Sequence, residues 1–392
     1  MERRDFLLAG AAVTGAGFPL VSAQAQVTAA GAARGSQTVF DFGAAGDGVT
    51  DDSAAFAKAL QYGAANGRIV IVPSATYAIA KPINFSSVGN AVNTWGLQCE
   101  GATLQSLITT GETVMNFVSN HTVRYFRLAG GLKIRGSGTD GNGLRIFAPL
   151  GKHFYNFLIE GLSVEGVGKD GLLVEGNVFE ASIYNSYFQD CLQNGATFAH
   201  SKGGICSAIA IYGSFFNQNG KYGLCATNFD AQYGGTTDVR VYGGYCRENK
   251  SYGFYYNNGT AGAAIEQVGF ENNCKGLQPG DQNGAHIYAM SSVQLRSCTG
   301  HNQFGGATYL LRGFFNGLTV LDGCRQSAGG AMAATGLSRL VQVHGTDTGH
   351  VLLRGSSGGV ATIANTKCTW RAENCSGPAP SGDLNIRTAA GV

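Results

Sequence analysis

The chain has 392 residues and a net charge of +2, and this small charge gives no indication of nucleic-acid binding. Hydrophobic residues reach 44%, aromatic residues 10% and charged residues only 13%, which excludes a disordered chain, because disordered segments are highly charged and poor in aromatic side chains. The 60 glycines occur with only 7 prolines and without a three-residue period, which excludes collagen and favours a β-rich fold with many tight turns.

The first 26 residues have the features of an export signal. Arg3 and Arg4 stand directly before a weakly apolar stretch, which is too short to span a membrane, and an A-x-A cleavage motif follows at residues 23–25. The arginine pair resembles the signal of the bacterial twin-arginine (Tat) route; an ordinary secretory signal is the alternative. We expect residues 1–26 to be removed during export by the Tat machinery, which leaves a periplasmic or secreted protein without a membrane segment. Residues 27–36 are expected to form a linker.

The most specific passage is VFDFGAAGDGVTDDSAAFAKAL at residues 39–60. Residues 39–42 suggest a short strand, and the glycines after it allow turn geometry that residues with a Cβ avoid. The oxygen-rich run at residues 50–52 suits a helix N-terminus, and apolar residues with helical spacing follow until Asn66-Gly67 ends the helix. Residues 68–73 are then expected to form a buried strand.

This passage resembles the N-terminal segment of the pectate-lyase superfamily domain found in rhamnogalacturonase-like and epimerase-like proteins. The family pattern is a DFGAxGDGxTDDT-type run, a helix, and a strand that ends in VPxGxY. Here Ser53 stands in place of the usual Thr, and Ala75 in place of the usual Gly. The resemblance covers a capping segment at about residues 37–85. It implies a pectin-lyase-like, right-handed parallel β-helix and a general association with polysaccharides.

Three aspartates of the capping segment have side chains that catalysis or calcium binding would need. They are Asp47, Asp51 and Asp52. Carboxylates directly before a helix accept backbone hydrogen bonds and favour the positive end of its dipole. This position and the family resemblance both favour a structural role for the three carboxylates.

A period of 24 to 30 residues organises the rest of the chain. Each repeat has an apolar or β-branched residue five positions before an apolar anchor. The anchors are Val164, Phe188, Phe216, Cys246, Phe270, Cys298 and Cys324. Coils of this size cannot bury their own apolar face and must stack, so we expect one all-β, single-stranded β-helix over residues 37–375 with about 11 coils. Residues 376–392 are expected to form a loose tail.

Polar residues and cysteines inside the repeats also follow the period. Asn219, Asn249 and Asn273 each stand three positions past an anchor, which predicts a ladder of stacked side-chain amides inside a turn. The three cysteines at anchor positions are expected to be interior, where Cys acts as a small hydrophobic residue. Cys368 and Cys375 are the pair that we expect to form a disulfide if any pair does.

Known active-site motifs of the superfamily are missing from the chain. Polygalacturonase-type sites need N-T-D, a D-D pair within the coils, G-H-G and R-I-K; calcium-dependent pectate lyases have a W-x-D-H run; alginate epimerases have D-P-H-D. None of these runs occurs within the repeats. No catalytic residue is therefore carried over by resemblance. We expect no cofactor, and calcium stays an alternative without a ligand motif.

Strand alternation places three columns of side chains on the outside of the predicted β-helix. The first column stands one residue after the apolar residue that precedes each anchor by five positions. Its members are Tyr184, Tyr212, Tyr242, Glu266 and Gln294. The column after the anchor is Gln189, Asn217, Arg247, Glu271, Thr299 and Arg325. The third column stands two residues after the glycine that begins the second strand of each repeat. Its members are Leu173, Thr197, Cys225, Tyr255, His286 and Thr308.

These columns give the candidate site residues. Tyrosine rings stack on sugars and lose little entropy, which predicts substrate binding by the aromatic members and one histidine: Tyr184, Tyr212, Tyr242, Tyr255 and His286. The alternative is that tyrosines on adjacent coils stack on one another and only stabilise the rod. The predicted catalytic residues are Glu266, Glu271 and Arg247. The alternative for Arg247 and Glu271 is an ordinary surface ion pair.

Two classes of function follow. The first is an exported polysaccharide lyase or glycoside hydrolase that works in a groove along the coils. A hydrolase would use Glu266 and Glu271 as its carboxylate pair, and a lyase would use Arg247 or a tyrosine as the base beside a uronate. The second is a non-catalytic glycan-binding or tailspike-like structural protein. The sequence favours the enzyme, with a polysaccharide as its partner and no nucleic acid.

Overall fold

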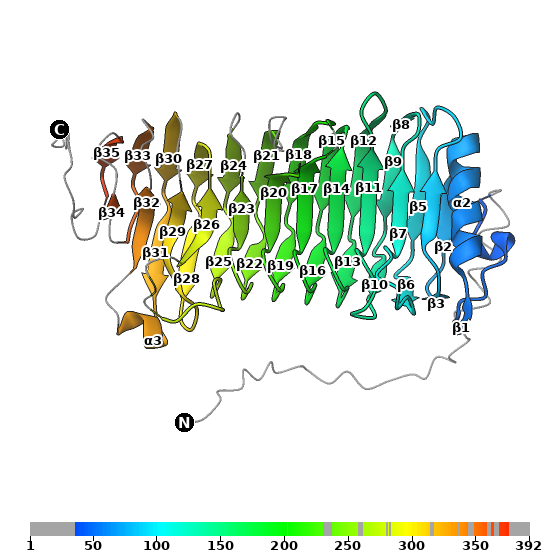
Figure 1. Ribbon diagram of the computed structural model, residues 1–392, viewed down its shortest axis with the longest axis horizontal. Helices are drawn as coiled ribbons and strands as arrows, with labels where there is room; N and C mark the ends of the chain where they lie inside the picture. The colour runs from blue at the N-terminus through cyan, green and yellow to red at the C-terminus, as the bar shows by residue number, and fades with distance from the viewer. Residues whose placement is uncertain are drawn as a thin grey trace, which may run out of the picture. The chain divides into compact units, whose positions relative to one another are not determined.

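The computed structural model describes residues 36–201, 203–229, 237–257, 262–279, 281, 284–313, 317–334, 338–343, 349–358, 362–363 and 368–375. The predicted export signal and C-terminal tail, and the linker apart from Ser36, lie outside these residues. The described chain winds into coils that each contribute one strand to each of three parallel sheets (Figure 1). The predicted parallel β-helix is therefore confirmed.

Sheet A is the longest of the three sheets, with 13 strands among the described residues. Its strands are β2 (Ile69–Val72), β5 (Trp95–Cys99), β8 (Thr122–Arg124), β9 (Phe126–Ala129), β12 (His153–Glu160), β15 (Val178–Tyr184), β18 (Cys206–Tyr212), β21 (Thr237–Tyr242), β24 (Ala263–Glu266), β27 (Val293–Arg296), β30 (Leu318–Asp322), β33 (His350–Arg354) and β35 (Thr369–Glu373).

Sheets B and C have 11 strands each within the described chain. Sheet B consists of β1 (Asp47–Asp51), β3 (Thr76–Ile79), β6 (Thr103–Ser106), β10 (Lys133–Arg135), β13 (Ser163–Glu165), β16 (Tyr187–Gln189), β19 (Phe215–Asn217), β22 (Tyr245–Arg247), β25 (Gly269–Glu271), β28 (Thr299–Asn302) and β31 (Arg325–Ala328). Sheet C consists of β4 (Ile83–Ser86), β7 (Met115–Val118), β11 (Leu144–Ala148), β14 (Leu172–Gly176), β17 (Ala196–His200), β20 (Leu224–Asn228), β23 (Phe254–Tyr256), β26 (Gly284–Ala289), β29 (Ala307–Gly313), β32 (Arg339–Val343) and β34 (Thr362–Ile363).

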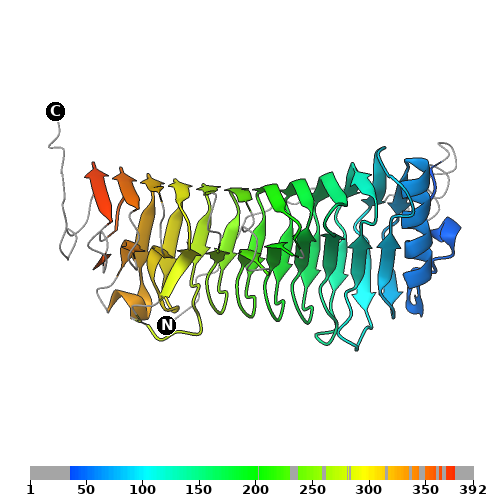
Figure 2. The ribbon, with the colours of Figure 1, turned by 45° about the horizontal axis from the view of Figure 1, so that its top comes forward.

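Helix α2 (Ser53–Asn66) packs against the first strands and covers the N-terminal end of the coils (Figure 2). Its predicted end is confirmed, because Gly67 adopts the left-handed conformation with φ of 60°. The predicted strand at residues 39–42 is wrong: these residues form a 3-10 helix, η1 (Val39–Phe42). The side chain of Asp41 accepts a hydrogen bond from the Thr38 amide at 2.7 Å, and this local bond stabilises a turn instead of an extended chain.

The three aspartates of the capping segment hold the chain before α2. Asp52 is buried and accepts hydrogen bonds from the backbone amides of Ala45 and Gly46 at 2.6 and 3.2 Å. Asp47 accepts hydrogen bonds from two backbone amides of its own turn. Asp51 accepts a hydrogen bond from the backbone amide of Ala80 at 3.1 Å. These bonds bear out the structural role expected from the sequence.

The predicted register is correct for the first five anchors and slips by two residues afterwards. Val164, Phe188, Phe216, Cys246 and Phe270 are strand partners in sheet B, and all are buried. The next partners are Gly300 and Gln326, not Cys298 and Cys324. A shift of two residues keeps the same side of the strand inward, and the two cysteines are indeed buried. The apolar pattern therefore does not distinguish the two registers.

The predicted asparagine ladder is confirmed. The side-chain amide of Asn219 donates to Asn249 Oδ1 at 2.9 Å, and that of Asn249 donates to Asn273 Oδ1 at 2.8 Å. Each amide also donates to a backbone carbonyl, and all three residues are at most 1% exposed. Buried amides that satisfy one another in this way fix the turn between sheets B and C from coil to coil.

The cysteines are free thiols in this structure. All ten are unpaired, and the expected candidates for a disulfide, Cys368 and Cys375, are no exception. Nine of the ten are buried, which agrees with a packing role. None of the helices in the described part of the chain has the length and apolarity needed to cross a membrane.

Candidate functional site

The outer face of sheet B has two columns of side chains with one residue per strand. The aromatic column, one position before the anchor, is Tyr187, Phe215, Tyr245, Gly269, Thr299 and Arg325. The polar column, one position after the anchor, is Gln189, Asn217, Arg247, Glu271, His301 and Ser327. The sequence prediction put Thr299 and Arg325 in the polar column. This was wrong because of the two-residue slip, which hid His301 and Ser327.

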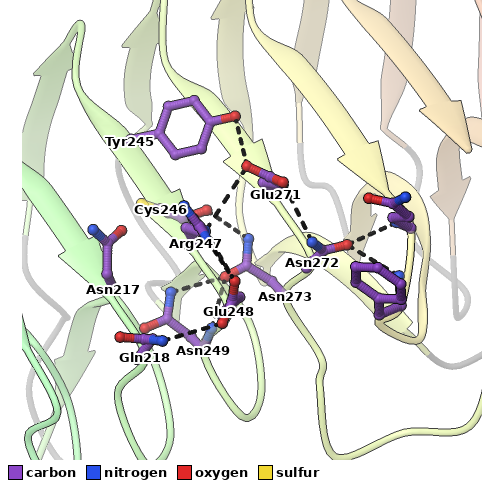
Figure 3. Close-up of polar contacts among 12 residues, drawn as sticks. Asn217, Gln218, Tyr245, Cys246, Arg247, Glu248, Asn249, Glu271, Asn272 and Asn273 are labelled. Carbon is purple, nitrogen blue, oxygen red and sulfur yellow. Dashed lines mark hydrogen bonds and ion pairs between the residues drawn. The ribbon is translucent and has the colours of Figure 1, made fainter. Parts of the chain in front are cut away.

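Arg247 and Glu271 are strand partners at the centre of the polar column, as predicted. The Arg247 Nε atom lies 3.9 Å from Glu271 Oε2, and the Tyr245 hydroxyl donates to the same oxygen at 3.2 Å (Figure 3). Burial, and then the Glu271 carboxylate, raise the pKa of Tyr245. The phenol therefore stays protonated at neutral pH and is a proton donor on this face.

Glu248 completes this cluster, and the sequence analysis missed it. Arg247 donates to Glu248 Oε1 at 2.8 Å, and Gln218 donates to the other oxygen at 3.2 Å (Figure 3). Lys275 contacts the same oxygen as Gln218, at 3.3 Å. Burial alone would raise the pKa of Glu248, but these hydrogen bonds outweigh it and lower the pKa. The hydrogen bond to Glu248 in turn raises the pKa of Arg247, so both groups stay charged. Glu248 lies in the turn after β22, outside the strand columns that periodicity can identify.

Tyr245 lies over the next strand because Gly269 leaves room for its ring. A Cβ atom at Gly269 would lie 2.1 Å from Cε2 of Tyr245. The ring therefore rests on the backbone of β25, and its hydroxyl reaches Glu271. Tyr245 makes no aromatic stacking contact with another described ring, unlike Tyr212, which has a ring on both faces.

Glu266 does not share this face. It belongs to β24 of sheet A and forms an ion pair with Arg296 at 3.6 Å, whereas Glu271 belongs to β25 of sheet B. Gln267 between the two strands has a φ of 55°, which turns the chain at the corner of the coil. Arg296, not Gln294, follows Glu266 in its column. The expected proximity of Glu266 and Glu271 on one face is therefore wrong.

Tyr184, Tyr212 and Tyr242 form the column that the sequence predicted, but their rings cover one another. The ring centroids of Tyr184 and Tyr212 are 4.6 Å apart at an interplanar angle of 8°, and those of Tyr212 and Tyr242 are 5.1 Å apart at 12°. Both faces of the Tyr212 ring are occupied, whereas Tyr184 and Tyr242 are each stacked on one face. The geometry agrees with the alternative of a rod-stabilising stack.

Tyr255 has the same arrangement on sheet C. Its ring lies 4.5 Å from that of Tyr222 and 5.8 Å from that of Tyr288, in nearly parallel planes. Tyr288, not His286, is the strand partner of Tyr255. The predicted stacking of sugars on Tyr255 therefore also lacks an open ring face.

His286 is interior, so its predicted place in a substrate-binding column is wrong. It is fully buried beside Phe270, and its Nδ1 atom lies 3.1 Å from the Asn273 amide nitrogen, at the end of the asparagine ladder. Burial lowers the pKa of His286 to about 3, so the imidazole is neutral. Phe254 pairs with Ile287, so His286 and not Gly284 follows Gly253 in the stack of coils. The sequence analysis counted two residues from Gly284 and therefore misplaced His286.

His301 is the histidine of the outer face of sheet B. It lies between Glu271 and Ser327 in the polar column, and its Nδ1 atom is 2.9 Å from Ser327 Oγ. The sequence analysis assigned His301 no role, because the correct register was needed to find its neighbours. Among the described residues, no group of three or more His, Cys, Asp or Glu side chains is arranged to hold a metal ion.

Comparison with protein families matches residues 37–124 to the model "Rhamnogalacturonase A/epimerase, pectate lyase-like". This match confirms the resemblance of the capping segment and extends it into the first coils. None of the curated proteins matches the chain in sequence. The family match ends before the polar column begins.

Solved structures share the fold at low sequence identity. ORF18 of Geobacillus virus E2 is 17% identical with a TM-score of 0.52, over 96% of this chain and 66% of that one. The A-module of the Azotobacter vinelandii mannuronan C-5 epimerase AlgE4 is 14% identical with a TM-score of 0.53, over 90% and 97%. The catalytic unit of a GH87 α-1,3-glucanase from Streptomyces thermodiastaticus is 16% identical with a TM-score of 0.50, over 89% and 70%. At these identities the likeness extends to the fold alone.

Proposed function

We propose that the protein is an exported enzyme that binds a polysaccharide along the outer face of sheet B and cleaves it by elimination at uronate residues. The epimerase and the glucanase with a similar fold are, as their names say, enzymes that act on carbohydrates, and this supports a polysaccharide ligand. The observation that carries the proposal is the cluster of Tyr245, Arg247 and Glu271 on one open face. Elimination needs a cation for the uronate carboxylate, a proton donor and a base.

Hydrolysis fits this face less well. A hydrolase needs two carboxyl groups on either side of the scissile bond, one of them protonated. Glu266 lies on a different sheet from Glu271. Glu248 is near Glu271, but its lowered pKa keeps it ionised, and Arg247 and Lys275 bind its oxygens. No described carboxyl group beside Glu271 is therefore suited to donate a proton to a leaving sugar.

Elimination assigns roles to Arg247 and Tyr245 of the cluster. Arg247, whose side chain is 49% exposed, contacts the uronate carboxylate and stabilises the negative charge that develops there. The Tyr245 ring, which has no aromatic partner among the described residues, supports a sugar, and its protonated hydroxyl donates to the departing glycosidic oxygen. Because the pKa of Arg247 and that of Tyr245 are both raised, neither acts as the base, in contrast to the expectation from sequence.

The test is a panel of polysaccharides incubated with the purified mature protein. Polygalacturonate, alginate and hyaluronan represent uronate chains, and dextran and laminarin represent neutral chains. We expect ultraviolet absorbance from unsaturated uronate ends with at least one uronate chain. New reducing ends without this absorbance would show hydrolysis and contradict elimination.

The second candidate is a non-catalytic glycan-binding protein. It is favoured by the mutual ion pairing of Arg247, Glu248 and Glu271, because such a network also stabilises a rod without any reaction. Retardation of the protein in a polysaccharide-containing gel, together with no new chain ends from any substrate, would select this candidate.

A further inference from the structure

His301 occupies the position next to Glu271 in the polar column, one coil further along sheet B. Its ring is half-buried, and Ser327 follows it on the next coil. Three successive strands of one face thus present a carboxylate, an imidazole and a hydroxyl. Imidazole is the side chain that most often moves protons in enzyme sites.

Ser327 contacts one of the two ring nitrogens of His301. The Ser327 hydroxyl donates to the carbonyl oxygen of Gly300 at 3.4 Å and lies 2.9 Å from His301 Nδ1. A hydroxyl proton directed to Gly300 leaves the Ser327 oxygen to accept the proton of Nδ1, and this is the arrangement that we expect. In a neutral imidazole the other ring nitrogen, Nε2, then carries a lone pair and is the basic atom.

Nε2 of His301 has no hydrogen-bond partner among the residues that the structure describes, which distinguishes it from Nδ1. Gly329, at the end of β31, lies beside the ring, and a Cβ atom there would approach Nε2 to 3.6 Å. Gly329 therefore places no side chain against this edge of the imidazole ring.

We propose that His301 is the general base of the elimination and that Ser327 is its positioning residue; this inference rests on the proposed function. Nε2 takes the proton from the carbon that bears the uronate carboxylate. The electrons of that bond form a double bond to the neighbouring carbon, whose bond to the glycosidic oxygen breaks. The Tyr245 hydroxyl protonates the departing oxygen, and the proton on His301 returns to Tyr245 through solvent. No oxidant or water is consumed.

The neighbouring charges suit this assignment. A sugar over Glu271 would have Arg247 on one side and His301 on the other, because the three residues lie on successive strands. The carboxylate of Glu271 lies one coil away from the imidazole of His301. A base and a carboxylate-binding cation on opposite sides of one sugar are what proton removal beside a carboxylate requires.

The positioning claim is tested without any substrate. Nitrogen NMR of the protein labelled at histidine nitrogen, with His301→Gln used to assign its signals, reports which ring nitrogen holds the proton in the neutral form. We expect the Nδ1-protonated tautomer for His301 in the wild type. Ser327→Ala should shift the population toward the Nε2-protonated form, and Ser327→Thr, which keeps the hydroxyl, should restore it. A wild-type ring protonated mainly at Nε2, or one unaffected by Ser327→Ala, would overturn the positioning role.

The catalytic claim is tested with the uronate chain that the wild type cleaves. His301→Gln should lower kcat by about 10²- to 10⁴-fold with KM nearly unchanged, as expected for a lost general base. His350→Gln is the matched control, because His350 lies on β33 of sheet A and should keep wild-type kinetics. Full activity of His301→Gln would overturn the catalytic role while the proposed function stands. A wild type inactive on every uronate chain would overturn the proposed function and the catalytic role together, and the tautomer measurement would still decide the role of Ser327.

Discussion

The Tyr212 ring lies between two nearly parallel rings, so we expect removal of its side chain to affect stability and not polysaccharide binding. Aromatic pairs contribute about 0.5–1.5 kcal/mol beyond the area that they bury. Tyr212 takes part in two such pairs, with Tyr184 and with Tyr242. We therefore expect Tyr212→Ala to lower the free energy of unfolding by about 1–3 kcal/mol in urea titrations. Affinity for a polysaccharide should be unchanged, whereas Tyr245→Ala should weaken it. Equal loss of affinity in both variants would mean that the sheet A tyrosines also contact the glycan.

Asn249 is the central member of the asparagine ladder. Its amide donates to Asn273 and to the Phe216 carbonyl, and its Oδ1 accepts from Asn219. Asn249→Ala leaves these buried partners unsatisfied and should lower the free energy of unfolding by about 1–3 kcal/mol. Lys250→Ala, at the exposed neighbouring position, is the control and should change stability little. An unfolding midpoint for Asn249→Ala equal to that of the control would contradict the energetic role of the ladder.

At the scale of the element, strand β25 shapes the site because it has no side chain at Gly269. A side chain at Gly269 would occupy the space of the Tyr245 ring. We expect Gly269→Ala to displace that ring, break its hydrogen bond to Glu271 and reduce polysaccharide binding at least as much as Tyr245→Phe does. Binding is measured by retardation in a polysaccharide-containing gel. Gly276→Ala, at an exposed glycine outside the columns, is the control. Wild-type retardation of Gly269→Ala would show that the ring position does not affect binding.

The strands and turns also show which residues of the site could be predicted from the sequence. Strand alternation placed Arg247 and Glu271 correctly, because five coils in succession carry apolar anchors such as Phe216 and Phe270. The register was lost where Gly300 and Gln326 replace apolar anchors, since a two-residue shift buries an equally apolar set. Glu248 was missed because the search for outward side chains was confined to the strands, and Glu248 lies in the turn after β22. The mutual stacking of the tyrosines was left as an alternative, since alternation gives the side of a strand and not the tilt of a ring.

At the scale of the whole molecule, the twin arginines predict the route of export. Replacing both, with Arg3→Lys and Arg4→Lys, should leave the full-length precursor in the cytoplasm, because the Tat route reads the arginine pair. Cell fractionation with detection of the precursor measures this. Lys152→Arg, outside the signal, is the control. Unchanged export of the double variant would indicate the general secretory route, which is the alternative that the sequence left open.

The stack of coils exposes several faces, and the central claim is that the polysaccharide lies on sheet B. Arg247 marks that face, and Glu266 marks the outer face of sheet A. The measurement is the rate of unsaturated-product release by the wild type, Arg247→Ala and Glu266→Gln on the same uronate chain. We predict that Arg247→Ala loses most of the activity, by about 10²-fold or more, while Glu266→Gln stays within about two-fold of the wild type. An active Arg247→Ala together with an inactive Glu266→Gln would contradict the account and place the reaction on sheet A.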